Sequence, residues 1–161
     1  ALAAFDELQR LSGHRVRPAL CGGQGEDVLG HLLHHLAGDG EPLQEILAYV
    51  QRKLQMSRDF PRESRLYANE IVQGAPRLGE TIATDLNALV EEKAALLESW
   101  MEAGRINRAH PKHLLFSIWS LTQHYADFEF QVRTLMGDED PYDAAADYLE
   151  TLYRRMLTPH T

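Results

Sequence analysis

The sequence predicts an all-α fold, and three observations support this. Apolar residues recur at spacings of three and four along most of the chain, which is the period of a helix with one buried face. Strand signals are nearly absent. The chain has 161 residues, of which 44% are hydrophobic, so it is long enough to bury one full-sized core.

Proline and glycine mark where the first expected helices begin and end. Pro42 follows a glycine-containing loop and opens a helix that ends near Ser57. The pair Phe60-Pro61 then breaks the chain, because proline cannot continue a helix and restricts the residue before it. A shorter helix follows and is interrupted at residues 74–76.

Two long helices and a terminal helix are expected after this point. The longest covers about residues 77–103, with Gly104 as its C-terminal stop. The next covers about residues 111–135 and is apolar nearly all round, so it is either central or buried against a second subunit. The last helix opens with Asp140-Pro141, an N-cap followed by proline.

The two C-terminal helices carry more apolar surface than one core of this size needs. This surplus predicts a homodimer in which these helices form a four-helix bundle. The expected interface residues are Phe128, Val132, Leu149, Leu152, Tyr153 and Met156.

Charge and composition limit the classes of function. The formal net charge of −8 confines any DNA contact to a small patch, because phosphate binding needs a local excess of Lys and Arg. There is no run of about eighteen apolar residues, and residues 1–10 lack the features of a signal peptide. We therefore expect a cytoplasmic protein with no membrane span. Cys21 is the only cysteine, so one chain forms no disulfide.

Polar residues interrupt the apolar helix at 111–135 and indicate a binding site or internal hydrogen bonds between packed helices; both interpretations stay open. Trp119 and Gln123 are four residues apart on one face, which places a flat ring beside an amide that both donates and accepts. A planar imide or amide suits that pair. The further candidate ligand-binding residues are Ser120 on the same helix and Tyr67, Asn69 and Glu70 on the shorter helix.

Three patterns in the sequence could indicate an enzyme, a metal site or a nucleotide site, and we reject each of these interpretations. Ser120, His124 and Asp127 project nearly in parallel from one helix and rarely converge as a catalytic triad. The histidines within 31–35 have no carboxylate on the same stripe, and the glycines at 22–25 follow no strand. We therefore expect no catalytic residue, no metal and no cofactor.

From about residue 41 to residue 159 the sequence resembles the ligand-binding and dimerisation region of TetR-family repressors, specifically the RutR-type regulators of pyrimidine utilisation. The resemblance is strongest at Ser57–Pro61, at Ser64–Glu70 with Gly74–Pro76, at Leu86–Trp100 and at Ile118–Phe128.

This resemblance implies an all-helical homodimer with a DNA-binding region at 1–36 and a ligand-binding and dimerisation domain at 37–161. In this branch uracil or thymine is the expected effector, and its binding releases operator DNA. The family reads DNA with a helix-turn-helix whose recognition helix lies in the major groove. Residues 17–20 resemble a piece of that helix, so the expected DNA-binding residues are Arg15, Arg17 and Pro18.

The N-terminal pieces that resemble the family are separated by stretches shorter than in the family. Either segments of a mobile DNA-binding domain are missing from this sequence, or the chain carries a shortened reading head; we favour the first explanation. The leading hypothesis is a repressor that a small planar effector releases from operator DNA. The alternative is an effector-binding and dimerisation module without DNA-binding activity.

Overall fold

A computed structural model describes residues 33 and 35–159 of the chain. Within this range every regular element is helical, which confirms the predicted fold class. The elements are α3 (Pro42–Asp59), α4 (Pro61–Val72), α5 (Gly79–Thr81), the π-helical segment η2 (Ile82–Leu86), α6 (Asn87–Glu102), α7 (Pro111–Asp127), α8 (Glu129–Met136) and α9 (Pro141–Leu157).

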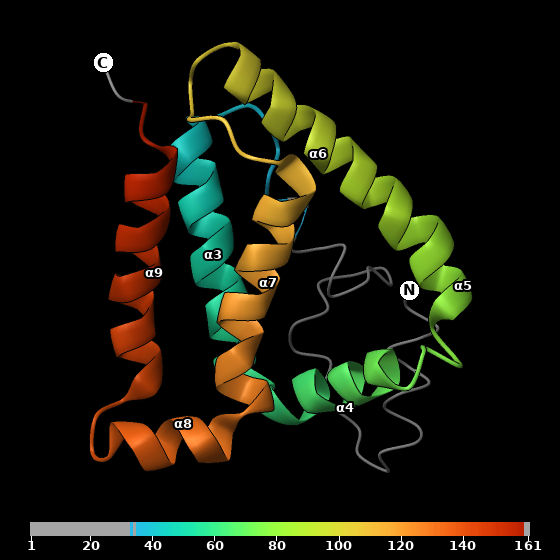
Figure 1. Ribbon diagram of the computed structural model, residues 1–161, viewed down its shortest axis with the longest axis vertical. Helices are drawn as coiled ribbons and strands as arrows, with labels where there is room; N and C mark the ends of the chain where they lie inside the picture. Colours follow the sequence, from blue (N-terminus) through green and yellow to red (C-terminus); the bar gives the residue numbers. More distant parts are fainter. Residues whose placement is uncertain (1–32, 34, 160–161) are drawn as a thin grey trace.

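Three helices stand side by side and form the body of the domain. Figure 1 shows α3 between α9 and α7, with α4 and α8 crossing the lower ends of these helices. α6 descends on the side away from α9 and packs against α7. None of the described helices has the length and apolar character needed to cross a membrane.

Proline begins four of these helices, where its missing N–H costs no hydrogen bond. The predicted starts at Pro42, Pro111 and Pro141 are confirmed. The predicted break at Phe60-Pro61 is also confirmed, since Phe60 leaves the helical conformation and α4 begins at Pro61.

The predicted helix over 77–103 is observed as one helical run from Gly79 to Glu102, made of α5, η2 and α6. Gly104 follows it with φ +67°, the left-handed conformation expected of a C-terminal glycine. The sequence did not predict the π-helical turn at Ile82–Leu86, a local widening that is often found at functional sites.

The prediction of one helix over 111–135 was wrong, because the helix breaks at Phe128 into α7 and α8. In an unbroken helix the carbonyl oxygen of Ala126 would accept the backbone N–H of Phe130. Instead, this oxygen accepts a hydrogen bond from Arg65 Nη1 of α4 at 2.8 Å. Asp127 also accepts a hydrogen bond from Ser64 Oγ at 2.7 Å. Contacts with α4 therefore end α7.

Hydrogen bonds and ion pairs at the start of α9 hold this helix against the end of α3. Asp140 caps α9, as predicted, by accepting the backbone N–H groups of Tyr142 and Asp143 at 2.9 and 3.3 Å. Arg58 at the end of α3 pairs with Asp140 and Asp143, each at 2.8 Å. These exposed ion pairs orient the two helices rather than supply much stability.

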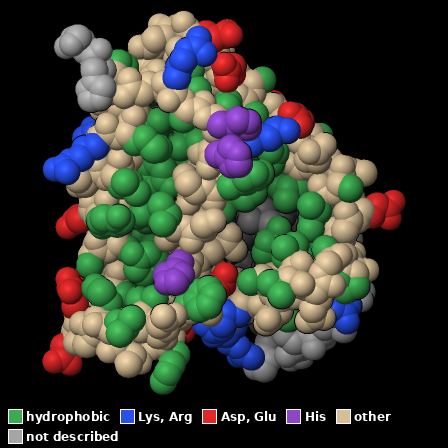
Figure 2. All heavy atoms as spheres, viewed as in Figure 1, with side chains coloured by type: hydrophobic (Ala, Val, Ile, Leu, Met, Phe, Trp, Pro, Cys, Tyr) green, Lys and Arg blue, Asp and Glu red, His purple; other side chains and the backbone are tan. Residues whose placement is uncertain are grey.

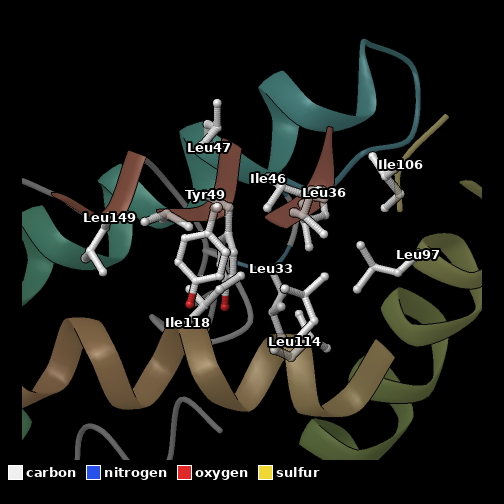
Figure 3. Packing of buried hydrophobic residues seen from close by; sticks show 14 of the residues in the cluster. Leu33, Leu36, Ile46, Leu47, Tyr49, Leu97, Ile106, Leu114, Ile118 and Leu149 are labelled. Atoms are coloured by element: carbon white, nitrogen blue, oxygen red, sulfur yellow. The ribbon is translucent and has the colours of Figure 1, made fainter. Parts of the chain in front are cut away.

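The core lies between α3, α6, α7 and α9 (Figure 3). Two residues predicted for the dimer interface, Leu149 and Tyr153, are each only 1% exposed and belong to this core. The Tyr153 hydroxyl also shares a hydrogen bond of 3.0 Å with Ser117 Oγ of α7. In the single subunit the two side chains therefore pack within its own core.

Candidate functional site

A small cavity opens between α3, α4, α7 and the π-helical turn. The space that the centre of a water molecule can occupy is about 20 Å³, room for little more than one water. A ring-shaped ligand therefore enters only when lining side chains shift. The lining residues are Leu33, Tyr49, Tyr67, Leu86, Trp119 and Gln123.

Three of the predicted ligand-binding residues meet at this cavity. Trp119 and Gln123 lie one helical turn apart on α7, and Tyr67 approaches them from α4. Sequence reasoning missed Tyr49 and Leu86. A tyrosine within the buried stripe of α3 was the available signal for Tyr49, because a buried hydroxyl needs a partner.

Tyr49 and Trp119 are joined by a hydrogen bond across the cavity wall. The Trp119 indole N–H donates to the Tyr49 hydroxyl at 2.6 Å, and Figure 3 shows the Tyr49 side chain pointing from α3 toward α7. Burial raises the pKa of Tyr49 well above its usual value, so the hydroxyl keeps its proton. Among the described residues no acceptor takes that proton. Tyr49 is therefore a donor available to a ligand.

The Gln123 amide lies half-buried at the same cavity and forms no hydrogen bond with any other described residue. It offers both a donor and an acceptor. The indole N–H of Trp119 is already used, so Trp119 presents its ring face rather than a hydrogen-bond donor. Trp119, Gln123 and Tyr49 thus provide one flat aromatic surface, two donors and one acceptor at this cavity.

The other predicted ligand-binding residues lie elsewhere. Asn69 and Ser120 are exposed, and neither lines the cavity. Glu70 is buried, but its carboxylate accepts hydrogen bonds from the backbone N–H groups of Arg77 and Leu78 at 2.6 and 3.3 Å. The first of these bonds is the main reason that the pKa of Glu70 is lowered. Glu70 therefore stabilises the turn that follows α4. Within this turn Ala75 has φ +53°.

Three polar residues lie about one helical turn along the chain from the cavity residues of α3, α4 and α7: Lys53 is buried, and Ser64 and Asp127 are half-buried. Lys53 is 4% exposed, and its ammonium makes no hydrogen bond or ion pair with the described residues. Burial lowers the pKa of Lys53 to about 8, and attraction to Asp127 partly offsets this. The Asp127 carboxylate accepts the hydroxyl of Ser64 at 2.7 Å.

The structure does not assemble Ser120, His124 and Asp127 into a catalytic triad. Ser120 and His124 are exposed, and the His124 ring stacks on Phe128 with centroids 5.0 Å apart. Asp127 is engaged by Ser64 of α4. Parallel projection from one helix keeps the three groups apart.

An apolar face covers the outer side of α7 and α9, where Figure 2 shows hydrophobic side chains gathered. Of the predicted interface residues, Phe128 and Met156 are exposed there and Leu152 is half-buried. Val132 is buried on α8. We give the name apolar face to the following exposed or half-buried residues of α7, its C-cap and α9: Phe116, Leu121, Phe128, Tyr148, Leu152 and Met156.

The predicted DNA-binding residues Arg15, Arg17 and Pro18 lie outside the described residues, as do His31 and His34. Most of the region predicted for DNA binding, residues 1–36, lies outside them as well.

Comparison with known proteins places these features in a family. A model of the TetR C-terminal class, described as "YcdC-like protein, C-terminal region", matches residues 26–160. The chain is 46% identical over 99 residues to the HTH-type transcriptional regulator RutR of Escherichia coli (strain K12) and to that of Shigella flexneri. It is 44% identical over 99 residues to RutR of Escherichia coli O157:H7. Each alignment covers 62% of this chain and 47% of the relative, so the chain spans about half the length of the curated relatives it matches.

Proposed function

Because the chain belongs to the TetR family of transcriptional regulators, through its YcdC-like C-terminal region, we propose that it is the sensor part of a repressor. The family consists of regulators rather than enzymes. In this proposal a small planar effector, a pyrimidine such as uracil or thymine, binds the cavity and releases the protein from operator DNA. Such a regulator acts where the DNA is, so we propose a cytoplasmic location.

The hydrogen-bonding groups of the cavity are the observation that carries this proposal. The uracil ring presents an N–H between two carbonyl oxygens. The Gln123 amide matches the N–H and one carbonyl, and the Tyr49 hydroxyl is free to donate to the other. The ring face of Trp119 offers a stacking surface. A cyclic imide therefore fits the available donors and acceptor better than a ring that carries only donors on this edge.

Substitution of Gln123 tests the ligand site. Gln123→Ala is expected to weaken uracil binding by about tenfold to a hundredfold, because the ligand loses one or two hydrogen bonds in a buried site. Isothermal titration calorimetry of wild type and variant measures this loss. Ser120→Ala is the matched control, since Ser120 is exposed on the same helix and does not line the cavity. Equal uracil affinity in the Gln123 variant and wild type would place the ligand elsewhere.

We further propose that the apolar face pairs with a second copy of the chain. Exposed patches of this kind mark interaction surfaces in proteins that are otherwise polar outside. The face lies on α7 and α9 and includes the exposed Phe116 and Met156. A two-fold symmetric pair of such subunits would present two DNA-reading ends to a palindromic operator.

A DNA-binding experiment distinguishes two candidate functions for this chain. One is a repressor, and the other is an effector-binding and dimerisation module with no DNA-binding activity. Selection from a random pool of duplex DNA is expected to enrich a palindromic sequence. Retention of that sequence should fall steeply with salt, because phosphate contacts release counterions. Uracil should reduce retention, since an effector acts only if it binds the free and DNA-bound states differently. A selected pool identical to the starting pool would favour the module.

A further inference from the structure

We propose that Leu86 is a specificity-determining residue of the effector cavity, which limits the size of substituents on the effector ring. This inference deepens the proposed function and rests on it, because it assigns a role in the same cavity. It is supported by the size of the cavity, by the positions of its polar groups, and by the π-helical turn on which Leu86 lies.

The cavity is too small for a ring unless part of its wall shifts. The centre of a water molecule has only about 20 Å³ to occupy, and a pyrimidine is several times larger than a water molecule. Binding therefore displaces lining side chains, and the size of a side chain that is displaced limits the size of the ligand.

Much of the wall is held in place by other contacts. Leu33 and Tyr49 are each 1% exposed and belong to the hydrophobic core, where side chains are closely packed. Trp119 is tied to Tyr49 by the hydrogen bond of 2.6 Å. Gln123 has to remain at the cavity if its amide is to recognise the ring. These constraints leave the part of the wall that α4 and the π-helical turn contribute.

Leu86 is the last residue of the π-helical turn, and none of the five residues of this turn is buried. The backbone N–H of Asn87 donates to the carbonyl oxygen of Ile82, five residues earlier, which is the hydrogen bond of a widened turn. The Leu86 side chain is half-buried and packs at the edge of the core. It can therefore shift, or be replaced by a side chain of another size, at less cost than a side chain within the core.

The positions of the polar groups indicate which edge of the ring meets Leu86. In the proposed function Gln123 of α7 and Tyr49 of α3 bind the imide edge of uracil. The opposite edge carries C–H groups at ring positions 5 and 6, and such an edge favours apolar neighbours. The aliphatic side chains that line the cavity are Leu33 and Leu86, of which Leu86 is the less buried. A substituent at ring position 5, such as the methyl group of thymine, then competes with Leu86 for space.

Isothermal titration calorimetry with uracil, thymine and 5-ethyluracil tests this inference. The dissociation constants of the three rings are compared as ratios within each protein, so that a general loss of affinity cancels. Leu86→Ala is expected to shift the ratio by at least about tenfold in favour of 5-ethyluracil, because the added carbon atoms fill the space that leucine leaves. Leu86→Met keeps the volume of the side chain and should leave the ratio unchanged.

Leu89→Ala is the matched control. Leu89 is a half-buried leucine of the same helical run and packs against the same core, but it does not line the cavity. This variant makes the same change in side-chain volume three residues away and should keep the wild-type ratio.

Quenching of Trp119 fluorescence by acrylamide provides a readout without any ligand. The chain has two tryptophans, so a Trp100→Phe background leaves the signal of Trp119 alone. Leu86→Ala should raise the quenching constant, because the quencher reaches the Trp119 ring through the enlarged cavity. Leu89→Ala should leave it unchanged.

The outcomes distinguish this inference from the proposed function. A wild-type ratio in Leu86→Ala, or an equal shift in Leu89→Ala, would overturn the role of Leu86. Failure of the wild type to bind any of the three rings would instead refute the proposed effector, and the quenching of Trp119 would still decide whether Leu86 closes the cavity.

Discussion

Replacing Phe116 and Met156 together with aspartate is expected to convert the proposed dimer into a monomer. Both side chains are exposed on the apolar face, at 44% and 40%. In a two-fold symmetric interface each subunit would bury both new carboxylates against the same surface of its partner, without a compensating cation. The dissociation constant should rise at least about a thousandfold, which corresponds to about 4 kcal/mol.

Sedimentation velocity over a range of concentrations measures this change, from twice the 18.3 kDa of the chain to that mass itself. Val72→Asp is the matched control, because Val72 is 85% exposed on α4, away from the apolar face. Unchanged helical circular dichroism shows that the double variant still folds. A double variant that remains dimeric would place the subunit interface on another surface.

The second large effect is expected from Lys53→Met, which should stabilise the protein at neutral pH. Burial lowers the pKa of Lys53 from 10.5 to about 8, so between these values the unfolded chain holds a proton that the folded chain does not. The contribution of Lys53 to the free energy of unfolding should therefore rise from pH 8 to pH 10.5, by about 3 kcal/mol. Near pH 10 the raised pKa values of Tyr49, Tyr125, Tyr142 and Tyr153 act in the opposite direction, because the unfolded chain loses these protons first. Methionine avoids the cost of the charge, in which the attraction to Asp127 is already included, and should add about 3 kcal/mol at pH 7.

Urea unfolding followed by tryptophan fluorescence at pH 7 and pH 10 measures both effects. The wild type and Lys93→Met should become more stable at the higher pH through Lys53, whereas Lys53→Met should lack that gain. If Lys53→Met is less stable than the wild type at pH 7, the charged ammonium contributes to folding, which contradicts the cost expected from its lowered pKa.

The helix boundaries could be predicted from sequence because proline and glycine act locally. Pro42, Pro61 and Pro141 restrict the backbone at their own positions, whatever the rest of the chain does. The break at Phe128 could not be predicted in this way, because it depends on Arg65 and Ser64 reaching α7 from more than sixty residues away. Nothing in the local sequence indicates that the carbonyl oxygen of Ala126 accepts a hydrogen bond from the distant Arg65.

The candidate site was predictable only in part, for a similar reason. Trp119 and Gln123 share a helix face, so their spacing in the sequence places them together. Tyr49 reaches the same cavity from α3, and only tertiary packing sets that approach. Lys53 can be recognised in the sequence, since it interrupts the apolar stripe of α3 between Ile46 and Ser57.

The π-helical turn at Ile82–Leu86 makes the chain tolerant of a change in length at one place. A π turn holds one more residue than an α turn, so deletion of the exposed Thr84 would restore regular helical winding. Because the π turn already accommodates the additional residue, α5 would keep about the same orientation relative to α6 after this deletion. The same deletion within regular helix would instead rotate everything before it by about 100°, so the π turn is the place in this helical run where the loss of one residue disturbs the packing least.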